Sequence, residues 1–83
     1  MSVPDNDVQG NQMIGRRLRD LRVGMSLTQT EVAERVGLTQ GRVSMLERGS
    51  TMNPIYLFRL ARLYGTTADY VIAGVVPDQQ SAA

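Results

Sequence analysis

Apolar residues recur at helical spacing in the first half of the chain. The residues that share one predicted helix face, separated by four, three and four positions, are Ile14, Leu18, Leu21 and Met25. We therefore predict a helix over residues 12–23, which Gly24 ends.

The segment over residues 27–49 has the pattern of two short helices joined by a glycine turn. Thr28 is a suitable N-cap residue, and Glu31 three positions later completes a capping box. Gly37 is expected to end the first of these helices, and Thr39 to cap the second. The predicted inward faces of the two helices consist of Val32, Ala33, Val36, Val43 and Leu46.

Two further helices are predicted after this segment. Asn53 followed by Pro54 is a strong helix start, and the helix is expected to run to about Tyr64. Thr67 is expected to cap a fifth, short helix over residues 68–73.

These elements predict one compact all-α domain of five helices. With 83 residues, of which 42% are hydrophobic, the chain has room for a single small core. The domain is expected to span residues 12–75. Residues 1–11 and 76–83 are polar, with little periodicity, so we expect them to form a flexible N-terminal arm and a flexible C-terminal tail.

The residue types that the sequence lacks exclude several classes of function. There is no cysteine and no histidine, which removes disulfides, Cys/His metal sites and thiol or imidazole catalysis. We find no nucleophile triad, acid–base pair or phosphate loop, so neither enzymatic activity nor a cofactor is expected. No apolar run approaches the roughly 18–20 residues that a membrane span needs. A cytoplasmic protein without a membrane partner is therefore expected.

Basic charge is concentrated in the centre of the chain. All 9 basic residues are arginines that lie between Arg16 and Arg62. Over residues 13–75 these nine arginines face five acidic residues, an excess of four positive charges. Such a domain suits a polyanionic partner, although a solvated arginine-rich surface would have the same composition.

Arg22 lies at the border of the apolar face of the first predicted helix, about 80° from Ile14 on a helical wheel. A partly buried arginine needs a carboxylate or carbonyl partner. Glu47, at the border of the inward face of the third helix, is the predicted partner. An exposed Arg22 is the alternative.

The short connection between the second and third helices predicts that they cross steeply. This arrangement is typical of a unit that places its second helix in the major groove of DNA while the first crosses the backbone. The predicted base-reading residues on the third helix are Gln40, Gly41, Arg42, Ser44 and Met45. Gln40 can pair with adenine and Arg42 with guanine, each through two hydrogen bonds. Ser44 can bond to a base edge, whereas Met45 offers apolar contact with a thymine methyl group.

DNA phosphates are expected at the N-terminal ends of the second and third helices, where free backbone N–H groups attract anions. The residues expected to contact phosphate there are Thr28, Gln29 and Thr39. Further candidates are Arg17, Arg35 and Arg48. For each of these arginines a purely solvated side chain is the alternative.

The sequence resembles the phage-repressor and Cro-like (XRE-type) helix-turn-helix family. The residues that carry the resemblance, within residues 13–74, are Ile14-Gly15, Arg22, LTQTEVAERVGLTQGRVSMLERG, Pro54 and LARLYGTTADYVIAG. The resemblance implies a lambda-repressor-like domain of five helices, with the helix-turn-helix at the second and third. It also implies a sequence-specific transcriptional regulator of double-stranded DNA, expected to be a repressor, that binds an inverted-repeat operator as a homodimer.

The same resemblance implies roles for individual residues. Gln29 corresponds to the glutamine that contacts phosphate and braces the first base-reading residue, here Gln40. Arg22 with Glu47 matches a structural ion pair of the family. Two base-reading positions depart from the polar residues often found there: Gly41 and Met45.

A dimer surface is predicted around the fifth helix, because its apolar residues exceed what one short helix buries in a five-helix core. The residues expected at this surface are Tyr70, Val71, Ile72 and Val75. The alternative function is an antitoxin or protein-interaction module on the same scaffold, with a toxin or another protein as its partner.

Overall fold

The chain forms five helices and, over the described residues 3–74, no strand. In this computed structural model the helices are α1 (Val3–Gly24), α2 (Gln29–Val36), α3 (Gln40–Glu47), α4 (Pro54–Leu63) and α5 (Ala68–Ala73). The predicted all-α fold of five helices is confirmed. Val75 and the tail predicted over residues 76–83 lie outside the described residues.

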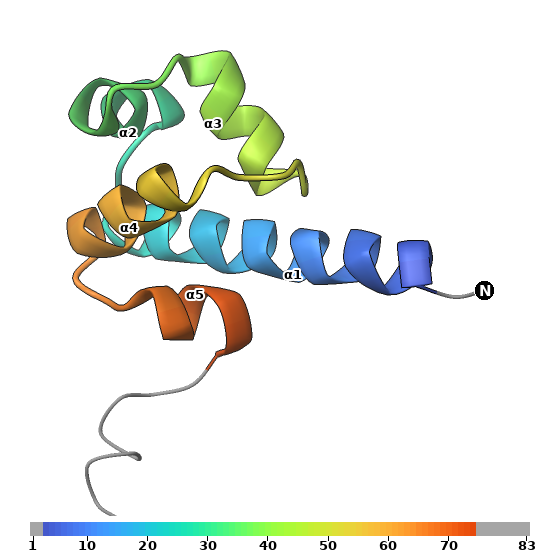
Figure 1. Ribbon diagram of the computed structural model, residues 1–83. Coiled ribbons are helices and arrows are strands. Elements are labelled where there is room, and N and C mark those ends of the chain that lie inside the picture. Colours follow the sequence, from blue (N-terminus) through green and yellow to red (C-terminus); the bar gives the residue numbers. More distant parts are fainter. Residues whose placement is uncertain (1–2, 75–83) are drawn as a thin grey trace, which may run out of the picture.

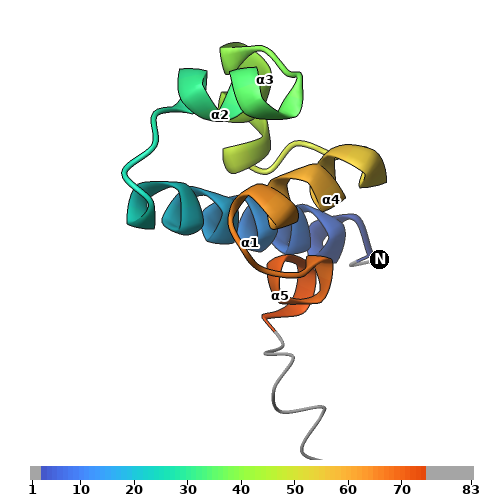
Figure 2. The same cartoon turned by 90° about the vertical axis from the view of Figure 1, so that its left-hand side faces the viewer.

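The long helix α1 is the platform on which the other helices are arranged (Figure 1). α2 and α3 lie on one side of α1 and α5 lies on the other, as the view turned by 90° also shows (Figure 2). α3 packs against both α1 and α2, while α4 contacts α2 and α5. The predicted helix-turn-helix segment is therefore held by α1 and α4.

α1 starts at Val3, well before the predicted residue 12. The predicted helix start at residue 12 is thus wrong, because residues 3–11 of the expected N-terminal arm are helical. Pro4 stands in the first turn, where its missing N–H costs nothing. Helix-start chemistry, rather than apolar periodicity, is the signal that marks this extension.

A capping box starts α2, as predicted. Thr28 Oγ1 accepts a hydrogen bond from the backbone N–H of Glu31 at 3.1 Å, and Glu31 Oε1 accepts one from the backbone N–H of Thr28 at 2.8 Å. The bond from the Thr28 N–H lowers the pKa of the Glu31 carboxyl below its ordinary value. Gly37 ends the helix with a φ of 83°, in the left-handed region where other residues are strained.

Side-chain caps also start the three remaining helices. The N-cap residues of α3, α4 and α5 are Thr39, Asn53 and Thr67. Each accepts a hydrogen bond from a backbone N–H of the first turn, which satisfies a donor that has no partner within the helix. α4 ends at Leu63, one residue before the predicted limit.

One hydrophobic core joins all five helices. Its buried residues are Leu18, Val32, Ala33, Val36, Val43, Leu46, Leu60, Ala61, Tyr64 and Val71. Burying one of the larger of these side chains contributes about 1.5–3 kcal/mol. The Tyr64 hydroxyl is the one buried side-chain polar atom of the described residues without a hydrogen-bond partner, and burial raises its pKa to about 12.

Gly15 allows α1 to touch the C-terminal end of α3. A Cβ atom at this position would lie 2.6 Å from the backbone oxygens of both Leu46 and Glu47, closer than real Cβ contacts occur. Any larger residue would therefore push α3 away from α1. Gly15 thus sets the distance between Arg22 on α1 and Glu47 on α3.

Candidate functional site

Arg22 on α1 and Glu47 at the end of α3 form an ion pair. Arg22 Nε lies 2.7 Å from Glu47 Oε2 and Arg22 Nη2 lies 3.1 Å from Oε1, so the guanidinium binds both carboxylate oxygens. The two side chains are only 13% and 4% exposed. The hydrogen bond to Glu47 raises the pKa of Arg22 above its ordinary value. Arg22 Nη1 also donates to Leu27 O at 3.0 Å, which ties α1 to the residue before the cap of α2.

The Glu47 carboxylate begins a chain of hydrogen bonds that leads to the outer face of α3. Glu47 Oε1 accepts a hydrogen bond from Gln29 Nε2 at 3.1 Å, and Gln29 Oε1 accepts one from Gln40 Nε2 at 2.6 Å. Because an ionised carboxylate can only accept, Gln29 must turn its amide nitrogen toward Glu47 and its oxygen toward Gln40. Gln40 in turn keeps its carbonyl oxygen and its second amide hydrogen for a ligand.

The outer face of α3 is open to solvent. Gln40, Gly41, Met45 and Arg48 are exposed, and Ser44 is half-buried. A Cβ atom at Gly41 would have no atom within 4 Å, so the backbone there is open to close approach. The structure therefore brings the predicted base-reading residues, apart from Arg42, together on one accessible surface.

Arg42 is directed toward the loop that follows α3. Its Nη2 donates a hydrogen bond to Thr51 O at 3.2 Å, and the side chain is exposed. A hydrogen bond of this kind contributes about 0.5–1.5 kcal/mol, so exchanging it for a ligand contact costs little.

The N-terminal ends of α2 and α3 retain donors for an anion. Thr28 and Thr39 use their hydroxyl oxygens as caps, which leaves the hydroxyl hydrogens free to donate. At the start of α2 the backbone N–H of Thr28 is taken by Glu31. The free backbone donors at this end are therefore those of Gln29 and Thr30.

A basic groove of about 360 Å³ lies between α1 and the C-terminal end of α3. Its lining residues are Gln12, Arg16, Arg19, Glu47 and Arg48. Since Glu47 already pairs with Arg22, the three arginines of the groove favour an anion. Sequence reasoning missed Arg16 and Arg19 as site residues. Their spacing on the polar side of α1 was a signal, but nothing in the sequence showed that α3 ends beside them.

Arg17 is not part of this surface, which corrects the prediction that it contacts phosphate. Its Nη1 donates hydrogen bonds to Val71 O at 3.1 Å and to Ile72 O at 3.0 Å, at the C-terminal end of α5. Arg17 thus completes the end of a helix that lies on the opposite side of α1 from α2 and α3 (Figure 2). Arg35 is also distant from the predicted phosphate contacts of α2, because it lies in the last turn of that helix.

The predicted dimer surface needs a second correction. Val71 is 0% exposed and belongs to the core, because α5 is packed against α1 and α4. Tyr70 is half-buried, whereas Ile72 is 49% exposed. Val75 lies outside the described residues. Only Tyr70 and Ile72 therefore remain as described candidates for contact with a second copy.

The described residues, 3–74, contain no group of three or more His, Cys, Asp or Glu side chains placed to hold a metal ion. Within the same range, none of the helices combines the length and apolar character that spanning a membrane requires.

Comparison with known proteins gives two findings. A family model described as helix-turn-helix matches residues 18–71. Among solved structures, the chain is similar to the P22 c2 repressor protein, crystallised in complex with synthetic operator 9T in the presence of Tl⁺. The TM-score is 0.73 at 28% sequence identity, and the match covers 77% of this chain and 98% of that chain. Both findings point to a DNA-binding regulator rather than an enzyme.

Proposed function

Because the chain belongs to the helix-turn-helix family of DNA-binding transcription regulators, we propose that it binds a specific inverted-repeat operator as a homodimer and represses transcription. In this proposal α3 enters the major groove while α2 crosses the DNA backbone. The observation that carries it is the hydrogen-bond chain from Arg22 through Glu47 and Gln29 to Gln40. This chain orients a base-reading amide before DNA arrives.

Gln40 is the residue proposed to read an adenine. One hydrogen of its amide nitrogen is donated to Gln29, so the second hydrogen and the carbonyl oxygen match adenine N7 and N6. Ser44 and Met45, one turn later on the same face, reach the next base pairs. Met45 offers a surface for a thymine methyl group, and Arg42 reads guanine after it leaves Thr51 O.

Contacts with phosphate are proposed on both sides of this reading face. At the start of α2, the backbone N–H groups of Gln29 and Thr30 and the Thr28 hydroxyl bind one strand. Thr39 is proposed to bind phosphate in the same way at the start of α3. The groove lined by Arg16, Arg19 and Arg48 receives the flanking backbone. Each neutralised phosphate makes the slope of log K against log salt concentration more negative by about 0.9.

The homodimer is proposed to match the two-fold symmetry of the operator. Two copies of α3 then lie in successive major grooves, with half-site centres about 34 Å apart. Tyr70 and the exposed Ile72 of α5 are the described residues proposed to touch the second copy. An operator that overlaps a promoter would give repression by excluding polymerase.

Selecting the duplexes that the protein binds from a random pool tests the proposal. Fluorescence anisotropy then compares the affinity for the selected duplex with that for a scrambled duplex. The expected result is enrichment of an inverted repeat, bound by two copies of the chain in sedimentation experiments. Equal affinity for the scrambled duplex would refute sequence-specific recognition. Saturation of the full repeat by one copy would refute the homodimer.

A reporter assay tests the regulatory effect. The selected operator is placed across a promoter, and expression is compared with and without the protein. Lower expression is expected with the wild-type chain, and expression near the unrepressed level with Gln40→Ala. Higher expression with the wild-type chain would overturn the repressor assignment without affecting the DNA-binding result.

A further inference from the structure

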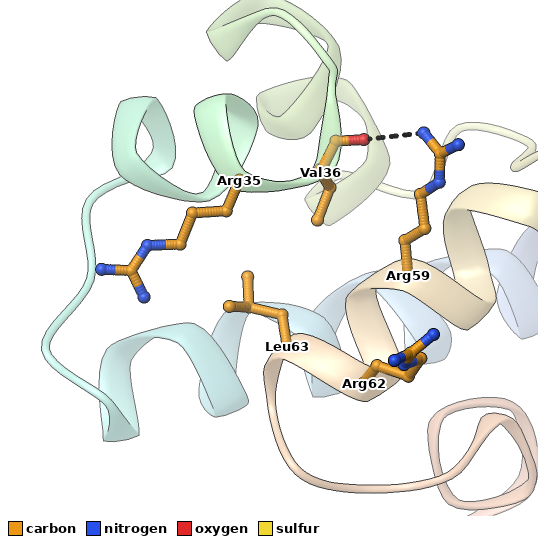
Figure 3. A pocket seen from close by; sticks show the side chains of 5 residues that line it. All are labelled: Arg35, Val36, Arg59, Arg62 and Leu63. Carbon is orange, nitrogen blue, oxygen red and sulfur yellow. Dashed lines mark hydrogen bonds between the residues drawn. The ribbon is translucent and has the colours of Figure 1, made fainter.

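A second basic groove, of about 430 Å³, lies between α4 and the C-terminal end of α2 (Figure 3). Its lining residues are Arg35, Val36, Arg59, Arg62 and Leu63, so three arginines and no acidic residue surround it. In the part of the chain that the structure describes, the sole ion pair is Arg22 with Glu47. None of the three arginines of this groove therefore forms an ion pair with a carboxylate there, although Glu31 lies within electrostatic range of Arg35.

The three arginines are held in different ways. Arg59 Nη1 donates a hydrogen bond to Val36 O at 3.2 Å, and its guanidinium lies 5.3 Å from the centre of the Tyr56 ring. All three arginines are exposed, and Arg59 is the one held by these two contacts. Figure 3 shows the Leu63 side chain between Arg35 and Arg62, below Val36. The groove thus combines three exposed guanidinium groups, one of them held in place, with an apolar floor.

We propose that this groove binds an acidic segment of a partner protein. Carboxylates of the segment pair with Arg35, Arg59 and Arg62, and an apolar side chain rests on the half-buried Leu63. Charge complementarity supports this occupant, because a carboxylate can accept two parallel hydrogen bonds from each guanidinium.

The position of the groove favours a protein over DNA. It is built by α2 and α4 alone, without any residue of α3. It lies at the C-terminal end of α2, an eight-residue helix about 12 Å long, whereas the free N–H donors lie at the other end. The apolar floor suits a hydrophobic side chain, for which a sugar–phosphate chain has no counterpart. Partner binding at this groove is therefore independent of the DNA contacts proposed above.

Fluorescence polarisation without DNA tests this inference. The probe is a labelled peptide in which pairs of glutamate and aspartate alternate with leucine, and its control carries glutamine and asparagine instead. The groove variant combines Arg35→Gln with Arg62→Gln, which leaves the bond from Arg59 to Val36 in place. The matched control, Arg16→Gln with Arg19→Gln, removes the same charge from the other groove.

The wild-type chain is expected to bind the acidic peptide saturably and its neutral control at least about tenfold more weakly, a difference of about 1.4 kcal/mol. The groove variant should lose about tenfold in affinity for the acidic peptide, and the matched control less than about twofold. No saturable binding by the wild-type chain, or equal losses in the two variants, would overturn the proposal.

Two further measurements separate the groove from DNA binding and from folding. Circular dichroism should show the same helix content in both variants, and perturbed amide NMR signals should map to Val36 and Leu63. The groove variant should keep the wild-type affinity for the selected duplex. A loss of duplex affinity in the groove variant, whatever the matched control does, would assign the groove to phosphate and overturn the protein partner.

Discussion

Gln29 is the middle member of the hydrogen-bond chain, and replacing it by alanine tests whether the chain prepares Gln40 for base reading. In the wild-type chain Gln40 Nε2 is held 2.6 Å from Gln29 Oε1. Gln29→Ala removes this partner and leaves the Gln40 side chain free to rotate. Fixing a glutamine side chain costs up to about 1.5–2 kcal/mol, and a neutral hydrogen bond contributes about 0.5–1.5 kcal/mol. We therefore expect Gln29→Ala to cost about 1–2 kcal/mol in operator binding.

A double-mutant cycle isolates the interaction between the two glutamines. Fluorescence anisotropy with the selected operator would measure Gln29→Ala, Gln40→Ala and the double variant. Once Gln40 is absent, Gln29 has nothing to orient, so the double variant should bind more tightly than additivity predicts. The expected coupling is about 1 kcal/mol, or about fivefold in Kd. The matched control is the cycle of Gln29→Ala with Ser44→Ala, because Ser44 takes no part in the hydrogen bonds that link Arg22, Glu47, Gln29 and Gln40.

Additive effects of the two glutamine substitutions, within about 0.3–0.5 kcal/mol, would refute the reasoning. The control pair should be additive within that range. Gln29→Ala should also relax discrimination at the base that Gln40 reads, in addition to a uniform loss from its phosphate contact. Alanine is a good helix former at the first position of α2, so helix content by circular dichroism should stay unchanged.

Three predictions concern stability, measured by urea unfolding followed by circular dichroism. Gly15→Ala should destabilise the fold by about 1–3 kcal/mol, because the new Cβ would meet backbone oxygens at 2.6 Å. Gly24→Ala is the control and should not destabilise it, because a Cβ atom there has no atom within 4 Å. Equal stabilities of the two variants would contradict the close contact at Gly15. Tyr64→Phe should stabilise by about 1 kcal/mol, because it removes an unpartnered buried hydroxyl. Burial raises the Tyr64 pKa to about 12 from 10.0, so the wild-type chain should lose stability between about pH 10 and 12. The Tyr64→Phe variant should lose less stability over this range. Parallel curves of unfolding free energy against pH for the two proteins would contradict this. Ser26→Gly should stabilise by roughly 0.5–1 kcal/mol, because Ser26 has a φ of 59°, and no gain would argue against strain at this turn.

The elements that sequence reasoning predicted best are those defined by local chemistry. Thr28 with Glu31, Gly37 and Asn53 with Pro54 mark helix boundaries through hydrogen bonds and φ preferences that span only a few residues. Such signals need no knowledge of the rest of the fold. The pairing of Arg22 with Glu47 spans 25 residues, yet it was predictable because a buried guanidinium restricts its partners so strongly.

The predictions that failed depend on which faces of distant helices meet. Nothing in the sequence distinguishes Arg17 from an arginine that faces solvent. In the structure, however, α5 ends beside Arg17 and supplies two carbonyl oxygens that accept its hydrogen bonds. The number of apolar residues in α5, taken alone, predicts that Val71 lies at a dimer surface. It is buried because α5 is packed against α1 and α4, an arrangement that no local pattern encodes.

α1 links the packing of the core to the proposed reading of bases, although it contributes no base-reading residue. Gly15 lets the C-terminal end of α3 approach α1, and Arg22, two helical turns later, binds the Glu47 carboxylate at that same end. Glu47 in turn orients Gln29, and Gln29 orients Gln40. A shift of α3 away from α1 would lengthen the first of these bonds and release the others in sequence. The orientation of the Gln40 side-chain amide therefore depends on Gly15, which makes no contact with Gln40 and acts only through the Arg22–Glu47 ion pair and Gln29.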